Sequence, residues 1–145
     1  MKIYCDGSCL GNPGLGGWSA LYIQNDKLVK KICGSERYST NNKMELRAAI
    51  EALKNLTTNE NKAELYTDSN YLKLGITEWI KNWKITNWNN GRIKNIEYWQ
   101  ELEALNLRLS IKWFWIKAHN KDKYNEIADK LARHAAINQI NLSNG

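Results

Sequence analysis

The sequence predicts an α/β fold in which helices cover both faces of a mixed five-stranded sheet. Short apolar runs alternate with longer amphipathic segments in the order three strands, helix, strand, several helices, strand, helix. The second and third strands are joined by a turn at Asn25-Asp26, which favours an antiparallel hairpin. The later strands follow helical segments, and strands joined by helical crossovers lie parallel. We therefore expect one sheet with both kinds of pairing.

Each element is delimited by local sequence signals. The first strand is the apolar run Ile3-Tyr4-Cys5, and we expect it to end at Asp6 because Gly7 follows and favours a turn. A cluster of capping residues at 39–42 opens an amphipathic helix over 43–56. By the same reasoning we predict strands over 17–24, 27–33, 63–67 and 109–116, helices around 71–76 and 79–83 and over 96–107 and 124–139, and an irregular loop over 85–95.

The composition is typical of one globular domain, which we expect to span residues 1–145. The chain has 145 residues, of which 43% are hydrophobic and 25% charged, and it contains no low-complexity tract or internal repeat. Its formal net charge of +6 makes an anionic partner plausible, with nucleic acid as the leading candidate.

The cysteines and the hydropathy pattern indicate in which cellular compartment we expect the protein. Cys5, Cys9 and Cys33 form no CxxC pair or Cys/His cluster, so neither a disulfide framework nor a zinc site is supported. No stretch approaches the roughly 20 apolar residues of a membrane span, and Asp6 interrupts any signal-like run. We expect a cytoplasmic protein that does not associate with membranes.

The glycine-rich stretch over residues 11–17 does not match the known phosphate-binding loops. A P-loop ends in Gly-Lys-Ser/Thr, whereas this stretch ends in Gly16-Gly17-Trp18. Gly17 also leads into a predicted strand, which excludes the glycine pattern that opens a helix in dinucleotide-binding folds. We interpret the stretch as a tight connection whose backbone can approach a ligand closely.

Four carboxylates stand out by position: Asp6, Glu45, Asp68 and Asp129. Each has an ordinary alternative explanation. Asp6 could belong to an Asp-Gly turn, and Asp68 could cap the helix that follows it. Glu45 follows Asn42 by three residues in what we take as the first turn of a helix, so it could complete a capping box. Asp129 could be a solvated residue of the final helix.

Taken together, these carboxylates predict a metal site. Adjacent parallel strands would place Asp6 and Asp68 side by side at the carboxyl ends of the sheet, where open α/β folds bind ligands. Clustered carboxylates repel one another, and hard divalent cations such as Mg²⁺ relieve that repulsion. Two such ions about 3.5–4 Å apart can activate a water and stabilise the leaving oxygen of a phosphodiester.

Four segments resemble those of type 1 ribonuclease H, and they occur in the same order. They are Tyr4-Cys-Asp-Gly-Ser-Cys-Leu-Gly-Asn-Pro-Gly, Thr40-Asn-Asn-Lys-Met-Glu-Leu, Tyr66-Thr-Asp-Ser-Asn-Tyr and Asn125-Glu-Ile-Ala-Asp-Lys-Leu-Ala. The resemblance covers residues 2 to about 136, which would be the core of the domain, followed by a short C-terminal tail. Agreement of several separated motifs is a far stronger signal than any one of them.

The resemblance implies a ribonuclease H-like fold and a monomeric endoribonuclease. Such an enzyme hydrolyses the RNA strand of RNA–DNA hybrids with two Mg²⁺ or Mn²⁺ ions per site and leaves 5′-phosphate and 3′-hydroxyl ends. By motif position, His119 matches a histidine linked to proton handling or product release. The residues that match the catalytic, metal-binding carboxylates of the family are Asp6, Glu45, Asp68 and Asp129.

The resemblance also implies contacts to the substrate. One group matches residues that read the minor-groove side of the RNA strand, where the 2′-hydroxyls lie: Gly11, Asn12, Asn41 and Asn70. Thr40 and Asn95 match a pocket for a DNA phosphate. Trp79 and Trp83 match a channel for DNA sugars, although both could simply belong to the core.

A basic stretch follows these tryptophans. Between Glu78 and Glu97 the chain carries no acidic residue, and its basic residues are Lys81, Lys84, Arg92 and Lys94. Cations interleaved with tryptophans suit a nucleic-acid backbone. The stretch resembles the basic protrusion of the family, but Asn89-Asn90-Gly91 makes it compact and poor in lysine.

Two other functions remain as alternatives. A nuclease of the same fold could cut DNA, as related resolvases and transposases do, although the Thr40-Asn41-Asn42 motif argues against it. A non-catalytic hybrid-binding module would be expected to have lost a carboxylate, and all four are present.

Overall fold

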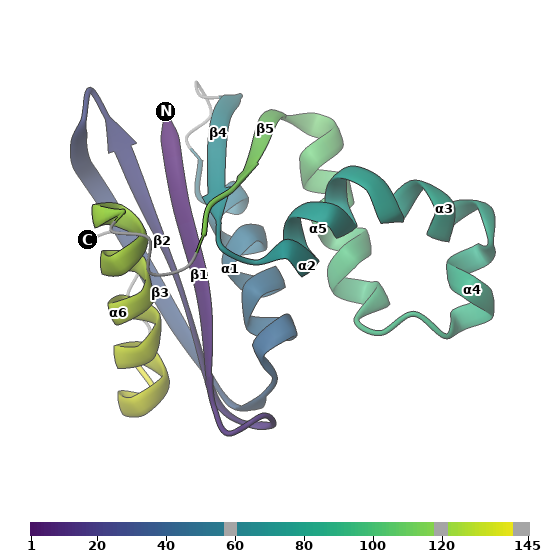
Figure 1. Cartoon of the computed structure of the whole chain (residues 1–145), viewed down its shortest axis with the longest axis horizontal. Coiled ribbons are helices and arrows are strands. Elements are labelled where there is room, and N and C mark those ends of the chain that lie inside the picture. The colour runs from purple at the N-terminus through teal and green to yellow at the C-terminus, as the bar shows by residue number, and fades with distance from the viewer. Residues whose placement is uncertain (57–60, 118–121, 141–145) are drawn as a thin grey trace.

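The computed structural model describes residues 1–56, 61–117 and 122–140. Within these residues the chain forms a five-stranded sheet in the order β3-β2-β1-β4-β5 (Figure 1). The pairs β1–β2 and β2–β3 are antiparallel, whereas β1–β4 and β4–β5 are parallel, which confirms the predicted mixed sheet. The strands are β1 (Lys2–Leu10), β2 (Gly14–Gln24), β3 (Lys27–Ser39), β4 (Lys62–Thr67) and β5 (Ser110–Trp115).

Strand β1 continues past Asp6, so the predicted end of the strand at that residue is wrong. Up to Tyr4, β1 pairs with β4, and Tyr4 lies opposite Tyr66. Beyond that point β1 continues in the hairpin with β2, where Asp6 lies opposite Ser19. Pairing with β2 outweighs the low strand propensity of Gly7 and the expected turn. Asp6 therefore lies within a strand, just beyond the point where β1 and β4 separate.

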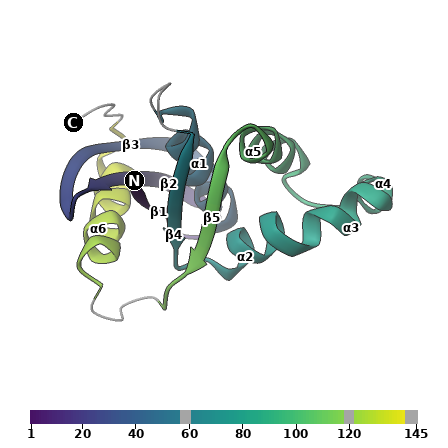
Figure 2. The same ribbon diagram turned by 90° about the horizontal axis from the view of Figure 1, so that it is seen from above.

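Helices cover both faces of the sheet, as the sequence predicted. Figure 2 shows α6 on one side and α1 and α5 on the other. The larger cluster of buried side chains joins the sheet to α1 and α5, and the smaller one joins it to α6. The helical elements are α1 (Asn41–Lys54), α2 (Asn70–Leu74), the π-helical turn η1 (Gly75–Trp79), α3 (Ile80–Ile85), α4 (Asn87–Gly91), α5 (Ile96–Arg108) and α6 (Lys123–Asn138).

Small residues let α6 lie directly on β2. Its buried face includes Ala128, Ala132 and Ala136. At Gly17 of β2, a Cβ atom would lie only 2.2 Å from the carbonyl oxygen of Ala132. This close packing fixes the position along the sheet at which α6 presents Asp129.

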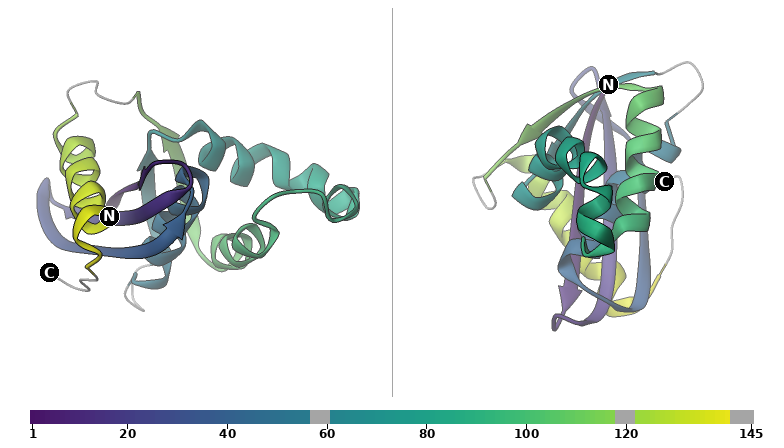
Figure 3. Two further views of the ribbon diagram at one scale, coloured as in Figure 1. Left: turned by 90° about the horizontal axis from the view of Figure 1, so that it is seen from below. Right: turned by 90° about the vertical axis from the view of Figure 1, so that its right-hand side faces the viewer.

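A helical arm projects from the sheet beyond α2, and Figure 3 shows α3 and α4 at its far end. The sequence predicted an irregular loop over 85–95. Residues 87–90 instead form a left-handed turn with φ between 52° and 57°, a conformation that costs most residues about 1–2 kcal/mol each. Three of the four residues are asparagine, which tolerates this conformation best after glycine.

Candidate active site

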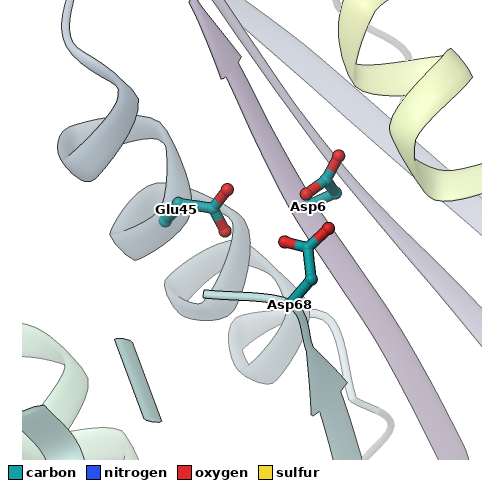
Figure 4. A group of neighbouring side chains, drawn as sticks. All are labelled: Asp6, Glu45 and Asp68. Atoms are coloured by element: carbon teal, nitrogen blue, oxygen red, sulfur yellow. The ribbon is translucent and has the colours of Figure 1, made fainter. Parts of the chain in front are cut away.

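Three of the four predicted carboxylates converge at one place in the fold. Asp6, Glu45 and Asp68 each offer an oxygen, and these oxygens lie within 4.8 Å of one another (Figure 4). Asp6 lies on β1 and Glu45 on α1, and Asp68 is the residue that follows β4. Asp6 is 2% exposed and Glu45 9%, so two of the three are taken almost completely out of water.

Glu45 is held by a contact between α1 and β1. The backbone N–H of Gly7 donates to Oε1 of Glu45 across 3.2 Å. The approach depends on glycine, because a Cβ at Gly7 would lie 2.5 Å from the backbone nitrogen of Glu45. The second oxygen, Oε2, is buried and has no hydrogen-bond partner among the described residues.

The capping alternatives for Glu45 and Asp68 are wrong. Thr40 caps α1, and its Oγ1 accepts from the N–H of Lys43 across 3.2 Å. Glu45 is therefore the fifth residue of α1, beyond the reach of a capping box. Ser69 caps α2, and its Oγ accepts from the N–H of Leu72 across 3.1 Å. Neither carboxylate is the N-cap of its helix, and both point into the shared site (Figure 4).

Asp129 lies beside Asp6 but is not one of the three mutually close carboxylates. Its charge raises the pKa of Asp6, and its Oδ2 lies 3.9 Å from Nε of Arg133, one helical turn further along α6. Its side chain is 30% exposed. The hydroxyl of Ser19, opposite Asp6 in the sheet, donates to the carbonyl of Ala128 across 2.7 Å and ties this turn of α6 to β2.

The carboxylates oppose one another electrostatically. Burial raises the pKa of Asp6 well above its usual range, and the charges of Glu45, Asp68 and Asp129 raise it further. Burial also raises the pKa of Glu45, as does the charge of Asp68, whereas the hydrogen bond from Gly7 acts in the opposite direction. Ionised carboxylates packed this closely would be stabilised by a cation bound among them.

The donor set fits a divalent metal ion. The three converging side chains offer only oxygen, the ligand that Mg²⁺ and Mn²⁺ prefer. The buried Oε2 of Glu45 is a polar atom that the described residues leave unsatisfied, and a cation would satisfy it. Asp6, Glu45 and Asp68 are therefore the residues that could hold such an ion, with Asp129 at its margin.

Several predicted RNA contacts lie together at the turn between β1 and β2. Oδ1 of Asn12 accepts from the backbone N–H of Asn41 across 3.0 Å, which joins this turn to the first residue of α1. Gly11, Asn12 and Asn41 are exposed. Thr40 precedes Asn41, and its hydroxyl oxygen is engaged in capping α1. Asn70 is the exposed first residue of α2, directly after Ser69.

Apart from Thr40 at the start of α1, the predicted contacts to the DNA strand belong to the arm and its junction with α5. Asn95 precedes α5, and its side-chain amide donates to the hydroxyl of Tyr71 across 3.2 Å. Trp79 is 39% exposed and lies 6.0 Å from Trp83, measured between ring centroids. Trp83 also packs against the buried Trp99 at 5.2 Å. The core alternative therefore fits Trp83 better than Trp79, whose ring remains accessible.

The cations of the arm are exposed, whereas the predicted histidine cannot be placed. Lys81, Arg92 and Lys94 are exposed, and Lys84 forms an ion pair with Glu103 at 3.0 Å. His119 lies outside the described residues.

Comparisons with known proteins identify the family. A family profile described as RNase H matches residues 1–137. The Ribonuclease H of Wolbachia sp. subsp. Drosophila simulans is 52% identical over 140 residues, which are 94% of this chain and 95% of that protein. The Ribonuclease H of Neorickettsia sennetsu is 47% identical over 142 residues, which are 96% and 94% of the two chains. The chain belongs to the RNase H family.

Solved structures of RNases H agree with the fold. LC9-RNase H1, a type 1 RNase H with the type 2 active-site motif, matches with a TM-score of 0.86 and 32% identity. The match covers 97% of this chain and 73% of that one. LC11-RNase H1, solved in complex with an RNA/DNA hybrid, has the same fold, with a TM-score of 0.72 at 19% identity over 94% of this chain and 96% of that one.

Membership of the RNase H family confirms the predicted class of enzyme. An RNase H is a metal-dependent endonuclease, and the family cleaves RNA in RNA–DNA hybrids. The converging carboxylates are consistent with the use of a divalent metal by the family. In the described part of this RNase H, no helix has the length and apolar character needed to cross a bilayer.

Two polar groups of this RNase H escaped the sequence reasoning. They are the backbone N–H of Gly7, which holds Glu45, and the hydroxyl of Ser19, which holds α6. A hydrogen bond from a backbone N–H such as that of Gly7 cannot be predicted from composition or from the spacing of motifs. Ser19 occupies an ordinary position within a strand, and its partner is 109 residues away along the chain. Only the tertiary structure reveals either contact.

Proposed function

We propose that this protein hydrolyses the RNA strand of RNA–DNA hybrids by two-metal-ion catalysis and leaves 5′-phosphate and 3′-hydroxyl ends. The observation that carries the proposal is the convergence of Asp6, Glu45 and Asp68 with a buried, unsatisfied oxygen on Glu45. Such all-oxygen sites suit Mg²⁺, with Mn²⁺ as an alternative. Asp129, whose charge acts on Asp6, completes the four carboxylates that would hold two ions.

The chain's own residues bind and orient the reacting groups. Divalent ions held by these carboxylates would activate a water and neutralise charge on the leaving oxygen. The oxygen of water adds to phosphorus and the water loses a proton, the bond from phosphorus to the 3′ oxygen breaks, and that oxygen gains a proton and leaves as a hydroxyl. Asp6 lies on β1 and Glu45 on α1, and Asp68 directly follows β4, so the fold positions these carboxylates before substrate arrives.

His119 is assigned to proton transfer by its motif position. An unperturbed imidazole titrates near pH 6.5 and can accept or donate a proton at neutral pH. His119→Ala should lower kcat by about 10²–10⁴, the range typical of acid–base groups, with little change in KM or Mg²⁺ affinity. A defect that extra Mg²⁺ repairs would instead make His119 a metal ligand.

Selection of RNA over DNA is assigned to the exposed polar groups around the β1–β2 turn. Only RNA carries the 2′-hydroxyl, which can both donate and accept a hydrogen bond. Asn12 and Asn41 are exposed, lie side by side and offer amide groups suited to it. Gly11 and Asn70 would add further contacts, while Thr40 and Asn95 would bind a phosphate of the DNA strand. Trp79, and to a lesser extent Trp83, would pack against DNA sugars.

The test is cleavage of matched substrates. Labelled RNA–DNA hybrid, RNA duplex and DNA duplex of one sequence are incubated with the protein, with and without Mg²⁺, and the product ends are identified. We expect cleavage of the RNA in the hybrid alone, dependent on Mg²⁺, with 5′-phosphate ends. Cleavage of the DNA duplex would support the DNA-cutting alternative. Binding of the hybrid without cleavage would support a binding module.

A further inference from the structure

The carboxyl end of β4 is tied to β5 by a side chain as well as by the backbone. Thr67, the last residue of β4, lies opposite Trp115, the last residue of β5. The backbone N–H of Ile116 donates to the carbonyl of Thr67 across 2.9 Å. One residue further on, the indole N–H of Trp115 donates to the backbone carbonyl of Asp68 across 3.0 Å. The Trp115 side chain thus joins β5 to the residue after β4, just beyond the last backbone hydrogen bond between the two strands.

This contact acts on the residue that carries one of the converging carboxylates. Asp68 follows β4 and precedes Ser69, the cap of α2, so it belongs to neither element. The N–H of Ser69 donates to Oγ1 of Thr67 across 3.1 Å. Contacts on Thr67, on the Asp68 carbonyl and on Ser69 therefore fix three successive residues. An aspartate side chain has only two torsions, so the position of its carboxylate follows closely from that of its backbone.

The exposure of Trp115 argues against a role mainly in the core. Its side chain is 43% exposed, whereas Trp99 is fully buried. Trp115 therefore buries less of its surface than Trp99 does, and what distinguishes it is the direction of its N–H. Trp113, on the same strand, provides a contrast, because its indole N–H donates to Oδ1 of Asn106 on α5 across 2.9 Å, away from the carboxylates.

We propose that Trp115 is a positioning residue that holds the Asp68 carboxylate in its metal-binding place through the indole N–H. This inference rests on the proposed function of the carboxylates, and it adds a residue that neither the motifs nor the cluster of acidic groups indicates. Trp115 does not touch the metal or the substrate in this role. Its loss should therefore weaken metal binding and catalysis while leaving the fold and the hybrid contacts intact.

The experiment replaces the donor and measures metal binding without substrate. Trp115→Phe keeps an aromatic ring and removes the N–H, and Trp113→Phe removes the same kind of donor from the same strand as a matched control. A third variant carries 3-benzothienylalanine at position 115, in which sulfur replaces the N–H with almost no change in shape. Mg²⁺ binding to the nucleic-acid-free protein is followed by titration calorimetry, and kcat, KM and thermal unfolding are measured in parallel.

We expect both variants at position 115 to bind Mg²⁺ about two- to tenfold more weakly than the wild type, the range that one net hydrogen bond supports. At limiting Mg²⁺ kcat should fall, with KM for the hybrid nearly unchanged and partial rescue at high Mg²⁺. Trp113→Phe should keep the Mg²⁺ affinity of the wild type, whatever its effect on unfolding. If Trp115→Phe fails to fold, the benzothienyl variant decides the outcome.

Three results would overturn the inference. One is unchanged Mg²⁺ affinity in folded variants at position 115, and another is an equal loss in Trp113→Phe, which would indicate general loosening of β5. A rise in KM alone would make Trp115 a substrate contact instead. If the wild type neither binds Mg²⁺ nor cleaves the hybrid, the proposed function itself fails, and this result is distinguishable from the other three.

Discussion

The backbone N–H of Gly7 and the carboxylate of Glu45 join β1 to α1 at the point where the acidic residues converge, with 3.2 Å between nitrogen and Oε1. The contact requires the two backbones to approach more closely than any side chain allows. A Cβ at Gly7 would lie 2.5 Å from both the nitrogen of Glu45 and the carbonyl carbon of Met44. The position of the Glu45 carboxylate and the packing of α1 on the sheet therefore both require that residue 7 has no Cβ atom.

Gly7→Ala should accordingly damage both stability and activity. The added methyl group meets backbone atoms rather than a flexible side chain, so α1 has to move. Overpacking of this kind typically costs about 1–3 kcal/mol, which urea unfolding would measure. Because Glu45 moves with α1, Mg²⁺ affinity should fall as well. Ser8→Ala, at the next residue, adds no atoms and should retain both properties. A Gly7→Ala protein with normal unfolding and Mg²⁺ affinity would contradict the packing argument.

Asp68→Asn should abolish hybrid cleavage while the metal-free protein remains as stable as the wild type or becomes more stable. The substitution removes a proposed metal ligand, but it also removes a negative charge that raises the pKa of both Asp6 and Glu45. Cleavage at saturating Mg²⁺ and urea unfolding without Mg²⁺ would test the two halves of this expectation. Asp26→Asn, in the exposed β2–β3 turn, is the matched control and should leave both measurements unchanged. Retention of most activity by Asp68→Asn would remove that residue from the site.

The stability of the metal-free protein should fall as pH rises. The pKa values of Asp6 and Glu45 are raised in the folded protein by burial and by neighbouring carboxylates, whereas in the unfolded chain they lie near 4. Between these values the folded protein holds protons that the unfolded chain has lost. The free energy of unfolding therefore declines with rising pH until the folded pKa values are passed.

Urea unfolding at a series of pH values between about 5 and 8, without divalent metal, would measure this decline. Asp6→Asn should show a shallower pH dependence than the wild type, because one raised carboxyl group is gone. Mg²⁺ should restore stability most at the upper end of the range, since it binds the ionised folded site. An Asp6→Asn protein with the same slope as the wild type would indicate that other groups control the pH dependence.

Hybrid binding should depend on salt through the exposed cations of the arm. Each phosphate contact made by Lys or Arg releases counterions, so the slope of log affinity against log salt counts such contacts. Replacing Arg92 and Lys94 together with alanine should reduce that slope by about one to two. Lys84 should contribute less, because Glu103 already neutralises it at 3.0 Å.

The matched control removes the same charge elsewhere. Lys27 and Lys31 are exposed on β3, at the edge of the sheet far from β4 and β5. Their double alanine variant should keep the slope of the wild type. Equal slopes for the two double variants would show that the arm is not the binding surface and that only net charge matters.

The order of elements and the convergence of three carboxylates could be predicted from the sequence, because both depend on patterns that can be recognised along the chain without the tertiary structure. Strands joined by helices lie parallel, and two such strands that are neighbours, as β1 and β4 are, bring Asp6 and Asp68 together. The length of β1 could not be predicted in this way. Its extension through Gly7 rests on pairing with β2, and glycine in isolation favours a turn.

The predictions of helix caps and turns were also wrong where two short-range rules compete. Residues 39–42 all favour capping, and the structure selects Thr40, which shifts Glu45 out of the first turn. The left-handed turn at 87–90 has no recognised sequence signal beyond its asparagines. The bond from Trp115 to Asp68 joins residues 47 positions apart, and the sequence gives no sign of it.

The parallel pairing of β1 with β4 has a consequence for the chain as it is synthesised. The two strands meet over only three residue pairs, Lys2–Glu64, Ile3–Leu65 and Tyr4–Tyr66, which are separated by about sixty residues of chain. Closing so long a loop costs entropy before the contacts that compensate for it can form. A nascent chain therefore has no assembled acidic site until β4 has emerged from the ribosome and docked beside β1. During refolding, the return of Mg²⁺ binding would report this long-range step rather than the earlier formation of helices.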